Sequence, residues 1–153
     1  MERSYTAAMG SSRIESGNCR SPRILRLVTY NLQRGIHYPL LLKHFTLLDP
    51  FRSADVVVVQ EALQPPDGVN TLARLAEDLK GNYSWTYRTV MSYPNKEYGN
   101  GFLFRSSMMP VAAQSIPLPQ VDRLGWAAKL KTEGGKPDTK LAFAQLFNWA
   151  GRL

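Results

Sequence analysis

Two polar residues stand where runs of β-branched and aromatic residues end. Asn31 closes the run 24–31, and Glu61 closes the run 55–61, which contains four consecutive valines. Side chains at the carboxyl ends of neighbouring strands converge in open α/β sheets. A carboxylate beside an amide suits a hard divalent cation such as Mg²⁺, which prefers oxygen ligands. The alternative is that Asn31 forms a turn and that Glu61 is simply solvated.

The elements around these residues alternate between strand and helix. The four valines do not alternate with polar residues, so we expect the strand 55–61 to be covered on both faces at the centre of a sheet. A helix is predicted over residues 40–48, where apolar residues recur at helical spacing, and Pro50 stops this pattern. A second helix is predicted between Asn70, which can cap its start, and Gly81, which marks its end.

The second half of the chain is predicted to be rich in strands. They are expected over residues 85–90, 101–105, 111–116, 125–131 and 139–147. The last two would form a hairpin-like pair, although residues 141–147 could instead form a short helix. The fold class expected is α/β, a partial α/β sandwich with mixed sheets. Residues 1–22 are expected to be a disordered tail, followed by one domain over residues 23–153.

The net charge and the cysteine content limit which partners and which cellular compartment are expected. The net charge of +7 favours an anionic partner, such as nucleic acid or a phosphorylated substrate. Five arginines against two glutamates in the first 26 residues supply +3 of it, so the alternative is that much of this charge belongs to the tail. The single Cys19 excludes an internal disulfide and fits a cytoplasmic location. No apolar run approaches the ~18 residues of a transmembrane segment, and no secretory signal is evident.

Three segments occur in a characteristic order: Thr-Tyr-Asn-Leu-Gln at 29–33, Val-Val-Val-Gln-Glu at 57–61 and Tyr-Gly-Asn-Gly-Phe-Leu-Phe-Arg at 98–105. With a helix expected between the first two, they resemble the first signature segments of the endonuclease/exonuclease/phosphatase superfamily, the DNase-like metal-dependent phosphoesterases. The resemblance spans about residues 23–110. It implies an endonuclease/exonuclease/phosphatase-like fold and an Mg²⁺- or Mn²⁺-dependent hydrolase that cleaves phosphodiesters or phosphomonoesters, as a nuclease does.

The same resemblance assigns roles to three residues. Glu61 would be a catalytic metal ligand, and Asn31 would help to position the metal or the phosphate. Asn100, from the Tyr-Gly-Asn segment, would line the pocket as a substrate-binding residue. The alternative for Asn100 is structural, because Gly99 and Gly101 could make a tight turn into a strand.

Other groups that the resemblance implies are missing from the sequence. Family members supply an Asp-x-Asn pair, a further Asp and late histidines, whereas this chain has only His37 and His44, both before Glu61. His44 is expected at the surface or core edge, and His37 lies near the presumed site without a matching role. We therefore expect a truncated and inactive phosphoesterase that lacks about half of the domain. Its substrate class stays open among DNA, RNA, inositol phosphates and phospholipids.

A second hypothesis, of a different class, is a non-catalytic half-domain that binds nucleic acid or a partner subunit. An open half-sandwich would expose a sheet edge and apolar surface. Such surfaces favour self-association.

Overall fold

The computed structural model describes the backbone of residues 8–10 and the chain over residues 24–119 and 141–148. These residues form a mixed α/β structure with two sheets. A five-stranded sheet has the order β1-β4-β5-β3-β2, and a two-stranded sheet pairs β6 with β7. The strands are β1 (Ala8–Gly10), β2 (Leu27–Asn31), β3 (Val56–Gln64), β4 (Tyr83–Tyr93), β5 (Lys96–Arg105), β6 (Met109–Pro117) and β7 (Leu141–Asn148). The helices are η1 (Gln33–Gly35, a 3₁₀ turn), α1 (Tyr38–Leu47), α2 (Asp49–Arg52) and α3 (Thr71–Asp78).

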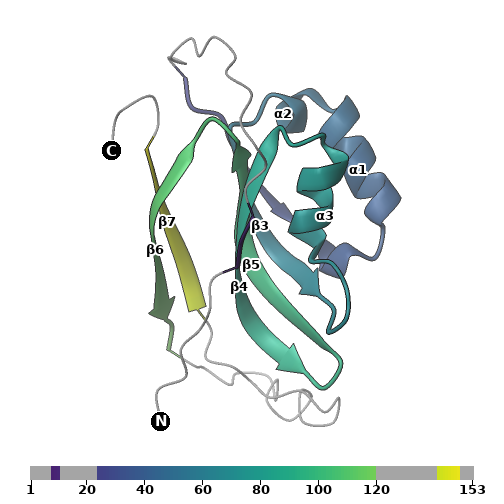
Figure 1. Cartoon of the computed structure of the whole chain (residues 1–153), viewed down its shortest axis with the longest axis vertical. Coiled ribbons are helices and arrows are strands. Elements are labelled where there is room, and N and C mark those ends of the chain that lie inside the picture. Colours follow the sequence, from purple (N-terminus) through teal and green to yellow (C-terminus); the bar gives the residue numbers. More distant parts are fainter. Residues whose placement is uncertain (1–7, 11–23, 120–140, 149–153) are drawn as a thin grey trace.

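The elements lie in three layers (Figure 1). The helices cover one face of the five-stranded sheet, and β6 and β7 lie against the other face. Phenylalanines join the two sheets, since the ring centroids of Phe102 and Phe143 are 5.3 Å apart and those of Phe104 and Phe147 are 4.8 Å apart. Within the described ranges, no helix combines the length and the apolar character needed to cross a membrane.

Strand β3 lies inside the sheet, as its four valines predicted. It runs parallel to β2 and antiparallel to β5. Val57 and Val59 are fully buried against the helices, and Val56 is buried against Phe104 on the other side. Val58 is half-buried. Both faces of β3 are therefore largely covered, which explains why hydrophobic residues do not alternate with polar ones here.

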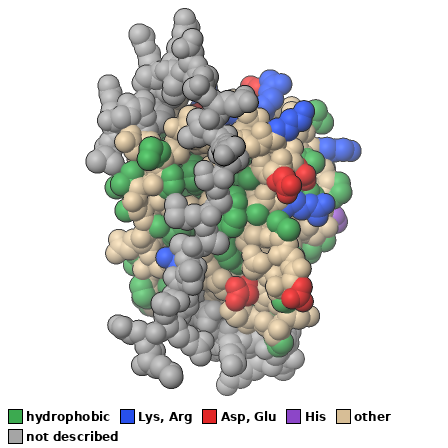
Figure 2. Space-filling view, in the orientation of Figure 1, with side chains coloured by type: hydrophobic (Ala, Val, Ile, Leu, Met, Phe, Trp, Pro, Cys, Tyr) green, Lys and Arg blue, Asp and Glu red, His purple; other side chains and the backbone are tan. Residues whose placement is uncertain are grey.

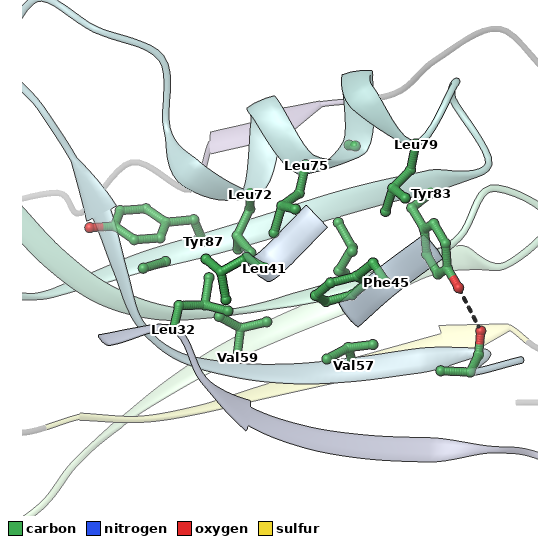
Figure 3. Close-up of a cluster of buried hydrophobic side chains, with 14 of the residues drawn as sticks. Leu32, Leu41, Phe45, Val57, Val59, Leu72, Leu75, Leu79, Tyr83 and Tyr87 are labelled. Atoms are coloured by element: carbon green, nitrogen blue, oxygen red, sulfur yellow. Dashed lines mark hydrogen bonds between the residues drawn. The ribbon is translucent and has the colours of Figure 1, made fainter. Parts of the chain in front are cut away.

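The core between the helices and the sheet holds α1 and α3 in place (Figure 3). The apolar stripe of α3 is buried, with Leu72 and Leu75 fully inaccessible. Asn70 caps α3 as expected, because its Oδ1 accepts a hydrogen bond of 2.8 Å from the backbone N–H of Leu72. The Tyr83 hydroxyl donates to the carbonyl of Ala54 at 3.1 Å and ties β4 to the segment before β3.

Several boundaries differ from the predicted ones. The strands expected at 85–90 and 101–105 are parts of one long hairpin, β4 and β5, which turns at residues 94–95. Pro50 does not simply stop helical structure, since it lies in the first turn of α2, where the fixed φ of proline is tolerated. The short-helix alternative for residues 141–147 is wrong, because β7 pairs along its whole length with β6.

Two predicted features involve residues that lie outside the described part. The strand expected at 125–131 is one of them, and the partner that the structure gives to β7 is β6. The tail predicted over residues 1–22 also lies mostly outside it. Residues Ala8–Gly10, however, form β1 and pair with β4, a strand that the sequence did not indicate.

Candidate functional site

The three predicted site residues lie in one row across adjacent strands of the five-stranded sheet. Asn31 of β2 is paired with Gln60 of β3. On the other side of β3, Val59 pairs with Gly101 and Ala62 with Gly99, so Gln60 and Glu61 both lie opposite Asn100 of β5. Asn31, Glu61 and Asn100, which are 30 to 69 positions apart in the sequence, are thereby brought to one level of the sheet.

A β-bulge places Glu61. Two residues of β3, Gln60 and Glu61, oppose one residue of β5, and Glu61 adopts a left-handed backbone conformation with φ of 55°. The expectation that Glu61 ends its strand is therefore wrong, since β3 continues to Gln64. The bulge absorbs the extra residue, and this allows the ladder to resume at Ala62 while the Glu61 carboxylate is redirected towards β2.

Asn31 connects the carboxylate to the following turn. Its Nδ2 donates a 3.0 Å hydrogen bond to Oε1 of Glu61, and its Oδ1 accepts one of 2.8 Å from the backbone N–H of Gln33. Asn31 ends β2 as predicted, and it is both a turn former and a contact of Glu61. Its side chain is exposed and that of Glu61 is half-buried, so both can be reached from solvent.

Asn100 lies within β5, so the alternative that it forms a tight turn is wrong. The two glycines beside it have another role. A Cβ at Gly99 would overlap the carbonyl of Arg88, and a Cβ at Gly101 would overlap the carbonyl of Thr86. A Cβ at Gly101 would also approach within 2.6 Å of Leu72, so both glycines face the helical side. Because side chains alternate along a strand, Asn100 faces the opposite side.

Backbone strain gathers at this end of the sheet. Four described non-glycine residues have a positive φ, and three of them belong to the site region: Gln33 (46°), Arg34 (63°) and Glu61 (55°). Each such residue costs on the order of 1 kcal/mol or more, and strain of this kind clusters at functional sites. Sequence reasoning missed Gln33 and Arg34, because only Gly35 of this turn carries a residue-type signal for a left-handed conformation.

A pocket beside Asn31 lies on the α1 side of the row. It has a volume of about 180 Å³ and is lined by Asn31 and His37, among others, but neither Glu61 nor Asn100 reaches it. His37 is therefore close to Asn31, as its position in the sequence suggested, without facing the whole row. His44 has a structural role, since its Nδ1 lies 2.6 Å from the Tyr30 hydroxyl and its ring stacks near Phe51.

The described residues near the row offer few groups that could activate water. Tyr87 lies beneath it on the helical side, and burial raises the pKa of its hydroxyl well above the usual value, with a smaller opposing effect of Thr89. Tyr87 is therefore neutral at physiological pH and cannot act as a base there. Across residues 24–119 and 141–148, no three His, Cys, Asp or Glu side chains are grouped in a way that could hold a metal ion. Glu61 would need the amide oxygens of Asn31 and Asn100 to complete even a partial oxygen ligand set.

The positive charge of the chain is not concentrated in its described part. Nine Lys or Arg residues and seven Asp or Glu residues lie in residues 24–119 and 141–148, which leaves +2 of the total of +7. On the face in view, basic and acidic side chains intermix on the helical side (Figure 2). The described residues therefore do not form one extended basic surface. An anion site on them would have to consist of a few neighbouring Lys or Arg side chains.

Comparison with known proteins gives no family for the chain: no protein-family model, curated protein or solved structure matches it.

The strain at Glu61 leads to a prediction about stability. Glycine is the residue that a left-handed position favours, so Glu61→Gly should be more stable than Glu61→Ala by about 1 kcal/mol. This order is the reverse of the usual one inside a strand. Urea unfolding of both variants measures the difference, and Val58→Gly against Val58→Ala is the control pair in the same strand. If Glu61→Gly is less stable than Glu61→Ala by as much as Val58→Gly is less stable than Val58→Ala, the bulge carries no strain.

Proposed function

We propose that this chain carries the metal- and phosphate-binding part of an Mg²⁺- or Mn²⁺-dependent phosphoesterase site, on a partial α/β sandwich of the endonuclease/exonuclease/phosphatase type. The observation that carries the proposal is the hydrogen bond of 3.0 Å between Asn31 and Glu61, held by a strained bulge at the row that also contains Asn100. The order of the three segments in the sequence and the helical layer behind a mixed sheet agree with it.

The donor set fits a hard cation. Glu61 has two carboxylate oxygens, and the bond from Asn31 occupies one of them, Oε1. Oε2 has no hydrogen bond within the described ranges and is available to a cation. A bound Mg²⁺ or Mn²⁺ would polarise a phosphoryl oxygen and stabilise the charge that develops on it. With one carboxylate in the set, the affinity for the ion is expected to be weak, because Mg²⁺ gives up its water reluctantly.

Asn31 and Asn100 would have separate roles beside the metal ligand Glu61. Asn31 restrains the Glu61 carboxylate and fixes the turn that begins at Gln33. Asn100 offers an amide on the same row, where a phosphate oxygen could accept its N–H. Substrate binding and orientation are thus the functions that these three residues support. We propose that the substrate is a phosphate ester, either a nucleic acid, a phosphorylated small molecule or a lipid headgroup. We also propose that the protein is cytoplasmic.

A second candidate function is a non-catalytic domain that binds nucleic acid or a partner subunit. It is favoured by the lack of any cluster of three metal-ligating side chains in the described ranges. Strand β2 is an edge strand of the larger sheet, and Leu27 on it is 61% exposed. Pairing of this edge with another chain would cover it, so self-association through it is part of this alternative.

The proposal predicts that divalent-ion binding depends on Glu61. Removing the carboxylate charge in Glu61→Gln should weaken Mn²⁺ binding at least about tenfold, which corresponds to about 1.4 kcal/mol. The measurement is titration calorimetry on the 153-residue chain. Glu77→Gln is the matched control, because Glu77 is an exposed glutamate on α3, away from the row.

Two results separate the candidates. If wild type and Glu61→Gln bind Mn²⁺ equally, Glu61 is not a ligand and the phosphoesterase proposal is lost. If only Glu61→Gln loses binding, while Glu77→Gln behaves as wild type, the row is the metal site.

A further inference from the structure

A pair of cations lies beside the row, held over tyrosine rings. The Arg34 guanidinium carbon is 5.0 Å from the centroid of the Tyr98 ring, and Lys96 Nζ is 5.7 Å from the same centroid. Lys96 Nζ is also 5.6 Å from the ring of Tyr93, and the two tyrosine rings meet edge to face at 5.5 Å. Two positive charges from distant parts of the chain therefore converge on one buried ring.

These two cations differ from two others that contact aromatic rings, Arg74 and Arg105. Arg74 lies over Tyr38 but has Asp78 at 3.9 Å, and Arg105 lies over Tyr83 but donates to the carbonyl of Ala54. Arg34 and Lys96 have neither a carboxylate nor a hydrogen-bond acceptor within the described ranges. Aromatic rings attract cations without neutralising them, so the charge of this pair is available to an anion.

The position of the pair relates it to the proposed site. Lys96, Tyr98 and Asn100 alternate along β5 and so share the face opposite to α3. Tyr98 is two residues from Asn100, about 7 Å along the strand. Arg34 lies three residues after Asn31, in the strained left-handed turn whose first N–H is fixed by Asn31. One elongated ligand can therefore contact the row and the cation pair together.

We propose that Arg34 and Lys96 form a subsite for a second phosphate of the substrate, and that this substrate is a single-stranded nucleic acid. The inference rests on the proposed function for the position of the first phosphate, which Asn100 would contact. Cations that track successive phosphates, next to an aromatic ring, are the features by which proteins bind single strands. Tyr93 is half-buried and provides the aromatic ring at the end of the hairpin.

The test is binding of a fluorescent hexathymidylate to the full chain in EDTA, over a range of NaCl concentrations. The double variant Arg34→Gln/Lys96→Gln should bind about tenfold more weakly at low salt, and the slope of log K against log salt should fall by about 1.4. The control is Arg74→Gln/Lys43→Gln, which removes the same charge from exposed positions on α3 and α1 and should change neither quantity substantially. Circular dichroism checks that both double variants are folded.

Three results would overturn the inference. They are an absence of hexathymidylate binding by wild type, equal weakening in the two double variants, and displacement of the oligonucleotide by inositol trisphosphate at equal phosphate concentration. The last would assign the pair to a compact polyphosphate instead. Because no metal is present, the measurement does not depend on metal binding by Glu61, so a failed metal site and a failed subsite are distinguishable. Suppose that Glu61→Gln loses metal binding while Arg34→Gln/Lys96→Gln binds the oligonucleotide as wild type does. The phosphoesterase proposal would then stand, and only the phosphate subsite would be wrong.

Discussion

Replacement of Val57 by aspartate is expected to leave no folded protein. Val57 is fully buried in β3, where it belongs to the core under the helices and pairs with Leu103 of β5. A carboxylate there would lose its hydration without gaining a partner, which costs several kcal/mol. Small domains have about 5–15 kcal/mol of total stability, so a loss of this size removes much or all of it. Soluble yield and far-ultraviolet circular dichroism would record the loss.

Val69→Asp is the matched control for this change. Val69 precedes α3 and is 61% exposed, so its replacement introduces the same charge without burying it. It should fold as wild type does. A cooperative thermal transition in Val57→Asp, close to that of Val69→Asp, would show that β3 is not the central strand of the core.

The second large effect concerns catalysis, and the expected result is that the 153-residue chain does not hydrolyse phosphate esters with Mg²⁺ or Mn²⁺. No histidine follows His44 in the sequence, and the described residues contain no group of three His, Cys, Asp or Glu side chains that could hold a metal ion. General-base catalysis typically contributes 10²–10⁴-fold, and absent metal and phosphate ligands would remove further rate. The measurement is cleavage of plasmid DNA, a short RNA and a chromogenic phosphodiester.

Contaminating nucleases are the main source of error in such an assay, so Glu61→Ala serves as the control. Equal residual rates in wild type and Glu61→Ala would belong to a contaminant and would agree with the prediction. Turnover that disappears in Glu61→Ala would contradict it. In that case the chain itself, alone or as an oligomer, completes an active site.

Residue types predicted the elements of the fold better than the details of the site. Four adjacent valines are compatible with few positions other than a covered strand, and the Asn70 cap with its apolar stripe is a strong helix signal. The position of β7 beside β6 was not predictable in the same way. Residues 141–147 are apolar without a clear period, and only the phenylalanine contacts across the sheets show which surface they cover.

The geometry of the site could be predicted in part. Strand order indicated that Asn31 and Glu61 would be neighbours, and the structure places them in direct contact. The bulge at Glu61 and the left-handed turn at Gln33 and Arg34 carry no residue-type signal, because glutamate, glutamine and arginine do not favour positive φ. Tertiary contacts must therefore offset the conformational cost of these positive φ angles. Burial of Leu32 before the turn and the close approach of Gly35 to Thr71 after it, where an added Cβ would lie 3.1 Å from Oγ1, are two of them.

The bulge in β3 also affects how the strand tolerates a change in length. Loss of one residue from a strand normally turns every later side chain to the opposite face. Here Val59 and Ala62 both face the helical core although three positions separate them, because Glu61 is the extra residue between the paired positions. A strand without Glu61 would alternate regularly and keep Ala62 in the core. The sheet therefore does not need Glu61 to keep its pairing and its core. Deletion of the single codon for Glu61 would convert the site into an ordinary strand and leave the rest of the sheet in register.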